Sequence, residues 1–226
     1  MNKPYSKSTL REYFESIAIA VILALFVRTF VVQAFKIPTG SMENSLLVGD
    51  HLLVNKFVFA PTGFDFEATL LPTRKIARGN VVVFKYPDDP SRDFIKRIIG
   101  LPGEIIELQN KNLYIDGNIL NEGYTKFLEL PLEDPSKLNQ NNFDVRRQYG
   151  PVTIPANQYF VMGDNRDNSQ DSRYWGFLPR EYIKGEAMLI YWSYDVKLES
   201  RSENILSKLK QLFTKPRWER FLHQIH

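Results

Sequence analysis

The feature that most constrains this chain is a long apolar stretch near its N-terminus. Eleven uninterrupted apolar residues begin at Ile17, and the apolar pattern continues past Arg28 to Phe35. As a helix, the 20 residues from Ser16 to Phe35 span about 30 Å, which matches the hydrocarbon thickness of a bilayer. An arginine near the end of such a helix reaches the interface at modest cost. We therefore expect one transmembrane helix over residues 14–35.

Two other interpretations of this stretch have to be weighed. A cleavable signal peptide is one, since residues 32–34 resemble a small-x-small cleavage site. Arg28 argues against it, because a cleaved apolar core does not usually contain a charge. A soluble amphipathic helix is the other, and it fits poorly because residues 17–27 are apolar on every side.

Charge is unevenly distributed along the 226 residues, whose net charge is +3. Residues 1–11 carry three basic side chains and no acidic one, and residues 197–226 carry a net charge of +4. By the positive-inside rule, residues 1–13 lie in the cytoplasm. Residues 36–196 then lie outside the cytoplasmic membrane, in the periplasm where an outer membrane exists. The mildly acidic body lacks the clustered basic residues of a nucleic-acid site, whereas two basic ends suit a phospholipid bilayer.

Beyond the anchor the pattern changes to short apolar runs bounded by turn residues, which is typical of buried strands. These runs are 52–54, 81–84, 105–108, 113–115, 119–120, 159–162 and 186–192. Asp116-Gly117, between two of them, is a strong hairpin signal because both central positions of the favoured turn need a positive φ. No long helical segments alternate with the runs. A parallel α/β sheet is therefore excluded, and we expect a mainly β domain over residues 36–196.

Two further segments differ in composition from this domain. Residues 121–150 are polar and rich in Pro and Asn, and we expect an inserted, mobile segment there. Residues 197–226 form a basic tail with a helical apolar period on both sides of Pro216. Such an amphipathic tail either lies in the lipid interface or packs on the domain, and the sequence leaves both alternatives open.

Missing residue types exclude several chemistries. Cysteine is absent, and two of the three histidines lie in the last four residues. A thiol nucleophile, a cysteine zinc site and a Ser-His-Asp triad therefore have little or nothing to be built from. The Gly-x-Ser-x-Gly, His-Glu-x-x-His, P-loop and dinucleotide-binding motifs are also absent. We expect no cofactor and no metal.

A serine nucleophile without histidine needs another base, and lysine serves when its pKa is low enough for the neutral amine to be populated. Ser41 follows Gly40 in a turn directly after the anchor. If residues 93–100 form a strand, Lys96 shares a face with Phe94, and apolar neighbours lower a lysine pKa by desolvation. From these residues alone, two other readings stay open: Ser41 as an ordinary loop serine, and Lys96 as a strand-edge lysine in solvent.

A third polar feature runs from Asp164 to Arg173 and is dense in Asp, Asn and Ser. A calcium loop starting at Asp167 would need Gly where Ser172 stands and Glu where Leu178 stands, so that interpretation fails. A tight polar turn held by internal Asp–Arg pairs is the better interpretation.

Three parts of the chain resemble the ordered signature sequences of one family. They are PTGSM after the anchor, GDHLLVNKF with RGNVVVFKYP and DFIKRIIGLPGE, and MGDNRDNSQDSRYWGFLP. In order and length they resemble bacterial type I signal peptidase (leader peptidase), over the anchor and nearly all of residues 30–110 and 159–192. The resemblance implies a mainly β, coiled and partly barrel-like antiparallel sheet domain behind one transmembrane helix. It also implies a serine endopeptidase that removes N-terminal signal peptides from exported preproteins.

The resemblance assigns roles residue by residue. Ser41 would attack the scissile carbonyl, Lys96 would be the general base, and the Thr39 hydroxyl would join the Ser41 N–H in the oxyanion hole. Three residues of the last stretch would orient or support the lysine: Ser169, Asp171 and Arg173. Six apolar residues would form substrate pockets that accept only small side chains: Phe35, Ile37, Met42, Leu46, Phe94 and Ile95.

One departure from the family pattern concerns the turn behind the nucleophile, where Asn44 replaces the usual proline and Ser45 a threonine. Losing the proline removes a φ constraint and loosens the turn, but it changes no atom used in bond-making, so we expect activity to survive. The expected partners are preproteins with Ala-x-Ala-type signal peptides, the bilayer and a nearby export translocon, without nucleic acid. Two rival functions remain: an anchored non-catalytic module and a cytosolic self-cleaving Ser-Lys protease.

Overall fold

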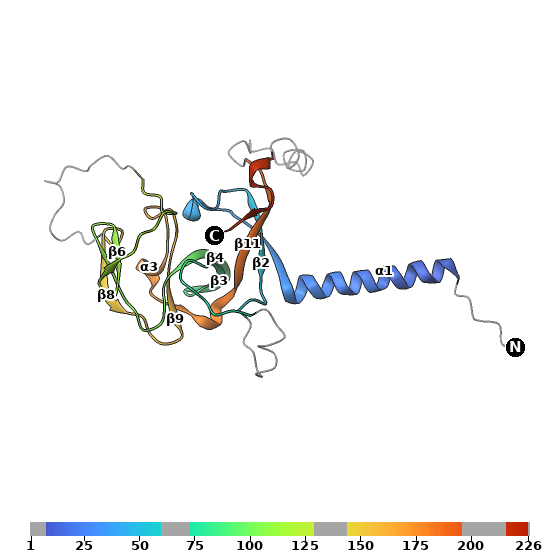
Figure 1. The fold of residues 1–226 in the computed structure, drawn as a ribbon, viewed down its shortest axis with the longest axis horizontal. Coiled ribbons are helices and arrows are strands. Elements are labelled where there is room, and N and C mark those ends of the chain that lie inside the picture. Colours follow the sequence, from blue (N-terminus) through green and yellow to red (C-terminus); the bar gives the residue numbers. More distant parts are fainter. Residues whose placement is uncertain (1–7, 60–72, 129–143, 196–215, 226) are drawn as a thin grey trace.

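The computed structural model describes residues 8–59, 73–128, 144–195 and 216–225. One long N-terminal helix projects from a β domain (Figure 1). This helix, α1, spans Thr9–Phe26 and continues as a π-helical turn, η1, over Val27–Val31. Strand β1, Val32–Lys36, follows it and is the first strand of the domain.

The domain is built from two sheets in which every strand pair is antiparallel. The larger follows the order β1-β2-β11-β3-β4-β9-β10, with β12 also on β11, and the smaller follows β7-β6-β5-β8. Among the described strands, neither path closes into a ring. The strands of the larger sheet are β2 (Asp50–Asn55), β3 (Val81–Tyr86), β4 (Asp89–Gly100), β9 (Gln158–Met162), β10 (Leu178–Pro179), β11 (Ile183–Ser193) and β12 (His223–Gln224). Those of the smaller sheet are β5 (Ile105–Gln109), β6 (Asn112–Ile115), β7 (Asn118–Ile119) and β8 (Gln148–Thr153). Short helical turns complete the fold: η2 (Gly40–Met42), α3 (Ser172–Trp175), η4 (Arg180–Tyr182) and η6 (Trp218–Arg220). The mainly β fold expected from the sequence is confirmed.

The N-terminal helix lies earlier in the chain than the predicted 14–35. It begins after Ser8, whose side chain accepts a hydrogen bond from the Arg11 N–H. It ends where residues 32–36 begin to pair with β2, because that pairing satisfies their backbone groups in place of a helix. The 23-residue helical stretch Thr9–Val31 contains an 18-residue window with a mean hydropathy of 2.1, and none of that window is buried. The helix is therefore long and apolar enough to cross a bilayer, as expected of a membrane anchor.

Both described ends of the segment 121–150, where the sequence predicts an inserted, mobile segment, are hydrogen-bonded to or part of the surrounding fold. The Lys126 N–H donates to the Asp164 carbonyl at 2.7 Å, and the Arg166 N–H donates to the Lys126 carbonyl at 2.9 Å. At the other end, β8 already begins at Gln148. These ends are part of the fold because they supply backbone partners to neighbouring segments. Residues 129–143 lie outside the described residues.

The tail also departs from its predicted helical period. Residues 216–225, which we call the strap, make only one helical turn, η6, and then form β12 against β11. Pro216 bridges Tyr194, and the Ile225 N–H donates to the Met188 carbonyl at 2.9 Å. The tail extends here because the edge of β11 offers unpaired backbone groups. The predicted helical stretch before Pro216 lies outside the described residues.

Candidate active site

The centre of the candidate site is a contact between one serine and one lysine. Ser41 lies in the helical turn η2, and Lys96 lies in β4. Lys96 Nζ is 2.6 Å from Ser41 Oγ, and only 3% of the lysine is exposed. Burial lowers the pKa of Lys96 to about 8, against the opposing effect of the Asp171 and Asp164 carboxylates. The two residues singled out in the sequence are therefore brought together, with the lysine in the environment that a base requires.

Lys96 does not lie on an edge strand, because β4 pairs with a neighbouring strand on each side. Lys96 pairs with Val82 of β3, and the next residue, Arg97, pairs with Met162 of β9. On the strand's own face, the Lys96 ammonium lies 5.6 Å from the centroid of the Phe94 ring, as the predicted alternation requires. The alternative of a strand-edge lysine in solvent is therefore wrong.

The turn that carries Ser41 is shaped by Asn44 rather than by Gly40. Asn44 has a φ of 119°, whereas the φ of Gly40 is not in the left-handed region. Proline, whose ring fixes φ near −65°, cannot occupy the observed Asn44 conformation. The expected loosening of the turn is not seen, because Asn44 Nδ2 donates to the Tyr124 carbonyl at 2.9 Å and Ser45 Oγ to Asp164 Oδ2 at 2.5 Å.

Two groups near the Ser41 side chain could donate hydrogen bonds to an oxyanion: the backbone N–H of Ser41 and the hydroxyl of Thr39. Ser41 is the second residue of η2, and the first N–H groups of a helical turn have no carbonyl partner within it. Thr39 precedes the turn in extended conformation, is exposed, and its side chain does not cap the turn. The exposed Thr39 side chain is therefore accessible to a ligand, two residues before Ser41.

Ser169 lies close to Ser41, but its hydroxyl makes no hydrogen bond among the described residues. A Cβ at Gly163 would be 2.3 Å from Ser169 Oγ and 2.4 Å from the Ser41 carbonyl oxygen. Only glycine therefore allows the two serines to approach so closely. The hydrogen bond from Ser169 to Lys96 that the resemblance implies is not formed in this structure, where Ser41 is the acceptor for the lysine.

The loop after β9 is held together by the pair that the resemblance implies, Asp171 with Arg173. Arg173 Nε donates to Asp171 Oδ1 at 2.8 Å and its Nη2 to Oδ2 at 2.9 Å, and both side chains are buried. Asp171 also accepts the Gly163 N–H at 3.1 Å, and Arg173 donates to the Arg166 carbonyl at 2.7 Å. This geometry fixes the loop that packs Gly163 against Ser41.

A second buried ion pair was missed by the sequence analysis. Arg97 donates to both carboxylate oxygens of Asp164, at 2.9 and 2.8 Å, and its guanidinium lies 4.0 Å from the centroid of the Tyr124 ring. Arg97 Nη2 also donates to Ser45 Oγ at 3.1 Å. One signal was available: an arginine inside a buried strand needs a carboxylate partner. The sequence does not show which carboxylate that is, because Asp164 is 67 residues away.

The six predicted substrate-binding residues do not form a single cluster. Four of them pack in one apolar cluster behind the nucleophile: Ile37, Met42, Leu46 and Ile95. Phe94 packs elsewhere, with its ring stacked on Tyr86 at a centroid distance of 4.4 Å. Phe35 lies in β1 opposite Leu52 and is half-buried. The structure therefore joins four of the six in one core cluster, in which Ile37, Met42 and Leu46 are almost fully buried.

Comparison with known proteins agrees with this site. The family model for "Signal peptidase, peptidase S26" matches residues 10–192. A signal peptidase I of Pseudomonas aeruginosa is 34% identical and aligns with 86% of this chain and 76% of its own. A probable signal peptidase I-2 of Synechocystis is 38% identical over 82% of this chain and 75% of its own, and a signal peptidase I P of Bacillus subtilis subsp. natto is 35% identical over 84% and 92%.

A solved structure of a signal peptidase I from Enterococcus faecalis V583 is 32% identical to this chain. The match covers 50% of the present chain and 97% of the solved one. Its TM-score of 0.39 is too low to bear on how the sheets are arranged. Family membership rests instead on the sequence matches, which span the anchor, Ser41, Lys96 and the loop after β9. The chain belongs to the signal peptidase family, peptidase S26, and is a hydrolase of the serine endopeptidase class.

Proposed function

We propose that this chain removes N-terminal signal peptides from exported preproteins, with Ser41 as the nucleophile and neutral Lys96 as its general base. The observation that carries the proposal is the 2.6 Å contact between Lys96 Nζ and Ser41 Oγ. Because burial lowers the pKa of this lysine to about 8, a useful fraction of the amine is neutral near neutral pH.

The chemistry follows from the two side chains. The neutral Lys96 amine accepts the Ser41 proton as Oγ bonds to the scissile carbonyl carbon. The Ser41 N–H and the Thr39 hydroxyl donate to the carbonyl oxygen as its negative charge develops. The Lys96 ammonium then protonates the leaving amine as the C–N bond breaks, and the signal peptide remains as an ester on Ser41. Water attacks this ester with Lys96 again as the base, which frees the serine.

The four clustered apolar residues support a preference for Ala-x-Ala-type sites. Ile37, Met42, Leu46 and Ile95 form a packed core behind Ser41, which leaves room beside it only for a shallow pocket that accepts a methyl group. A bulky side chain at the −1 or −3 position is excluded sterically, which costs more than the about 1–3 kcal/mol that an apolar pocket gains per methylene. In an extended substrate the −2 side chain points away from Ser41, so many different residues should be accepted at the −2 position.

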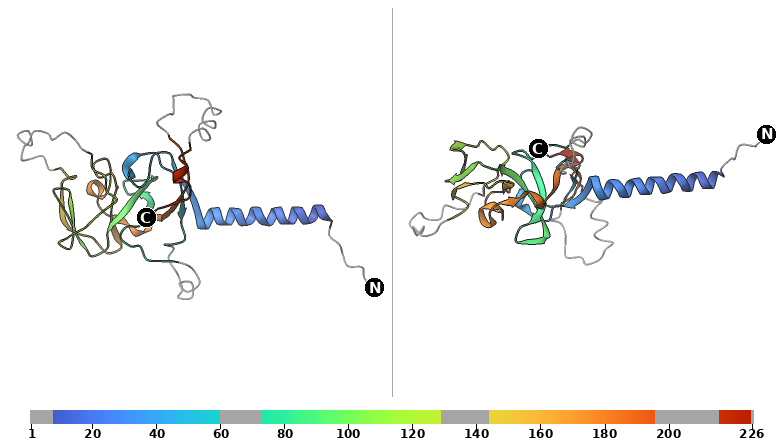
Figure 2. Two further views of the ribbon diagram at one scale, coloured as in Figure 1. Left: turned by 45° about the horizontal axis from the view of Figure 1, so that its top comes forward. Right: turned by 90° about the horizontal axis from the view of Figure 1, so that it is seen from below.

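The position of the anchor supports catalysis close to the membrane surface, on its outer face. Ser41 closely follows β1, which joins the anchor to the domain. The strap and the junction with α1 lie at the same end of the domain in every view (Figures 1 and 2). Three strap residues expose large apolar side chains there, suited to the lipid interface: Trp218, Phe221 and Leu222. With residues 1–13 cytoplasmic, the site faces preproteins as they leave the export translocon.

Cleavage of a model preprotein by the full-length chain in detergent micelles tests the proposal. Ser41→Ala and Lys96→Ala should each abolish cleavage, while Lys85→Ala, an exposed lysine on the neighbouring strand, should cleave normally. The double variant should be no worse than either single one, because the two residues act as a unit. Normal turnover by Lys96→Ala would overturn the assigned base, and an inactive wild type would favour the rival of a non-catalytic module.

A further inference from the structure

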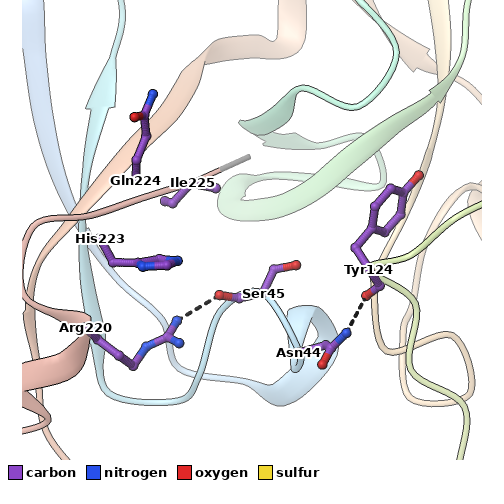
Figure 3. A pocket seen from close by; sticks show the side chains of 7 residues that line it. All are labelled: Asn44, Ser45, Tyr124, Arg220, His223, Gln224 and Ile225. Carbon is purple, nitrogen blue, oxygen red and sulfur yellow. Dashed lines mark hydrogen bonds between the residues drawn. The ribbon is translucent and has the colours of Figure 1, made fainter.

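The turn behind the nucleophile is held from outside the catalytic loops by the strap, residues 216–225. Arg220 Nη2 donates to the Ser45 carbonyl at 2.8 Å and to Asp50 Oδ2 at 2.7 Å, and its Nε also contacts the Asp50 carboxylate. Figure 3 shows the Arg220 side chain reaching from the strap to Ser45. The strap is 170 residues from Asp50 in the chain, yet it makes a direct polar bridge to the segment that carries Ser41.

The strap is joined to the turn by packing as well, since Ile225 lies against the cluster that contains Met42 and Leu46, but Arg220 makes the polar contact with Ser45. A pocket lies between the strap and the turn, lined by Asn44 and Ser45 on one side and by residues 223–225 of the strap on the other (Figure 3). Arg220 spans the polar edge of this pocket. Its side chain is 15% exposed, and that of Asp50 is completely buried. A buried carboxylate that loses its cation is strongly unfavourable, so the Arg220–Asp50 pair fixes the strap in place.

The opposite side of the same turn is connected to the catalytic strand. Ser45 Oγ donates to Asp164, whose carboxylate is paired with Arg97, the neighbour of Lys96 in β4. Ser45 is therefore held by its hydroxyl from the catalytic side and by its carbonyl from the strap side. The Leu46 N–H closes the turn by donating to the Met42 carbonyl at 2.8 Å. A shift of Ser45 would be passed to Ser41 through these few residues.

We propose that Arg220 is a positioning residue for the nucleophile, and that the strap is a required part of the active site although it supplies no reacting group. Arg220 acts through the Ser45 carbonyl, which sets the turn and thereby the distance between Ser41 Oγ and Lys96 Nζ. Misplacement of a reacting group by about 1 Å costs on the order of 100-fold in rate. The inference rests on the proposed Ser41–Lys96 dyad.

The test compares substitutions of the strap arginines in the full-length protein in micelles. Arg220→Gln should lower kcat by roughly 100-fold and change KM by no more than about 3-fold. The variant should still be folded at the temperature of the assay. The midpoint of the kcat–pH profile should stay where it is in the wild type, because Arg220 contributes neither to the burial of Lys96 nor to the charges that set its pKa. Arg220→Lys should lose roughly 10-fold in kcat, since it keeps the charge for Asp50 but lacks the fork that also reaches the Ser45 carbonyl.

Two variants of the same strap are matched controls. Arg217→Gln removes a cation 4.0 Å from Asp50 and a donor to the Val48 carbonyl at 3.1 Å, but it leaves the Ser45 contact intact. Glu219→Gln changes an exposed neighbour. Both should keep kcat within about 3-fold. Normal kcat in folded Arg220→Gln would overturn the proposal, as would equal losses in Arg217→Gln and Arg220→Gln. If Arg220→Gln does not fold, Arg220→Lys decides, and normal kcat there would overturn it. Failure of the dyad itself would be recognised separately, by cleavage in Ser41→Ala.

Discussion

Strand β4 carries two adjacent buried cations whose environments differ sharply. Lys96 faces Ser41 and Phe94 and has no ion pair among the described residues, whereas Arg97 shares two hydrogen bonds with Asp164. Both side chains are almost completely buried. The difference between them is the carboxylate partner. Burial without a partner makes a cation easy to deprotonate, and burial with one keeps it charged.

The comparison also separates function from stability. In the folded chain the pKa of Lys96 is about 8, below its ordinary value of 10.5. Between these two pH values the unfolded chain holds a proton that the folded chain has lost, so the contribution of Lys96 to stability rises with pH across that window. Below pH 8 its burial is a net cost. In the proposed mechanism Lys96 therefore serves catalysis at the expense of stability, while the Arg97–Asp164 pair is part of the structure that holds the site.

The sharpest way to test this contrast is to remove the lysine. Lys96→Met fills the same space without an amine, so cleavage should fall by about 10⁴-fold or more, as when other activated serine nucleophiles lose their base. Because a buried ammonium is lost, the melting temperature at pH 7 should stay the same or rise. Turnover and thermal melting of one sample measure both effects. A large drop in melting temperature would contradict the view that this cation is not structural.

Removing the partner of the second cation should have the opposite outcome. Asp164→Ala leaves Arg97 buried and unpaired, which should cost about 3–5 kcal/mol in the free energy of unfolding. Asp93→Ala breaks the partly exposed pair with Lys184 and should cost no more than about 1 kcal/mol. Denaturant unfolding of both variants gives the two values. Similar costs would mean that Arg97 finds another partner when Asp164 is absent.

The pH dependence of turnover tests the role of Lys96 without any substitution. Only the neutral amine of Lys96 accepts the Ser41 proton, so kcat should rise with pH to a plateau through a midpoint near 8. At two pH units below that midpoint the rate should be about 100-fold below the plateau. A midpoint in the histidine range would instead point to a base other than Lys96.

Local patterns in the sequence predicted the features that depend on neighbouring residues. The alternation in β4 placed Lys96 beside Phe94, and Asp116-Gly117 links β6 to β7 with φ values of 49° and 79°, as the favoured hairpin turn requires. The apolar stretch predicted the helix, although its end was misplaced. Such features follow from the period of two or 3.6 residues and from turn chemistry.

The features that the sequence did not predict depend on contacts between distant segments. Arg97 finds Asp164 after 67 residues, and Arg220 finds Asp50 after 170. The helical apolar period of the strap gave a wrong prediction, because residues 223–224 form a strand that pairs with the edge of β11. The left-handed backbone of Asn44 was missed because an asparagine in a turn has several accessible conformations, and here tertiary hydrogen bonds to Tyr124 select one.

The smallest expected effect concerns two serine hydroxyls on either side of the dyad. Ser45 Oγ bonds to Asp164 and Arg97, whereas Ser169 Oγ is buried without a hydrogen-bond partner among the described residues. Ser45→Ala removes hydrogen bonds to charged groups and should cost about 1.5–3 kcal/mol in unfolding free energy. Ser169→Ala removes a buried hydroxyl that makes no hydrogen bond in the resting enzyme, so its unfolding free energy should stay the same or rise.

The effects of these two substitutions on turnover should not follow their effects on stability. Once Lys96 is neutral and its lone pair faces Ser41 Oγ, an amine N–H is free to donate to Ser169, which would hold the lone pair in line. We therefore expect Ser169→Ala to lose roughly 10-fold in kcat despite its unreduced stability, since an oriented base contributes about 10²–10⁴-fold in total. Denaturant unfolding and single-turnover cleavage of the same preparation measure the two quantities. A destabilised Ser169→Ala would show that the hydroxyl has a partner in the resting enzyme. Unchanged kcat would leave the orientation of Lys96 to the packing of β4 against Phe94 and Val82 alone.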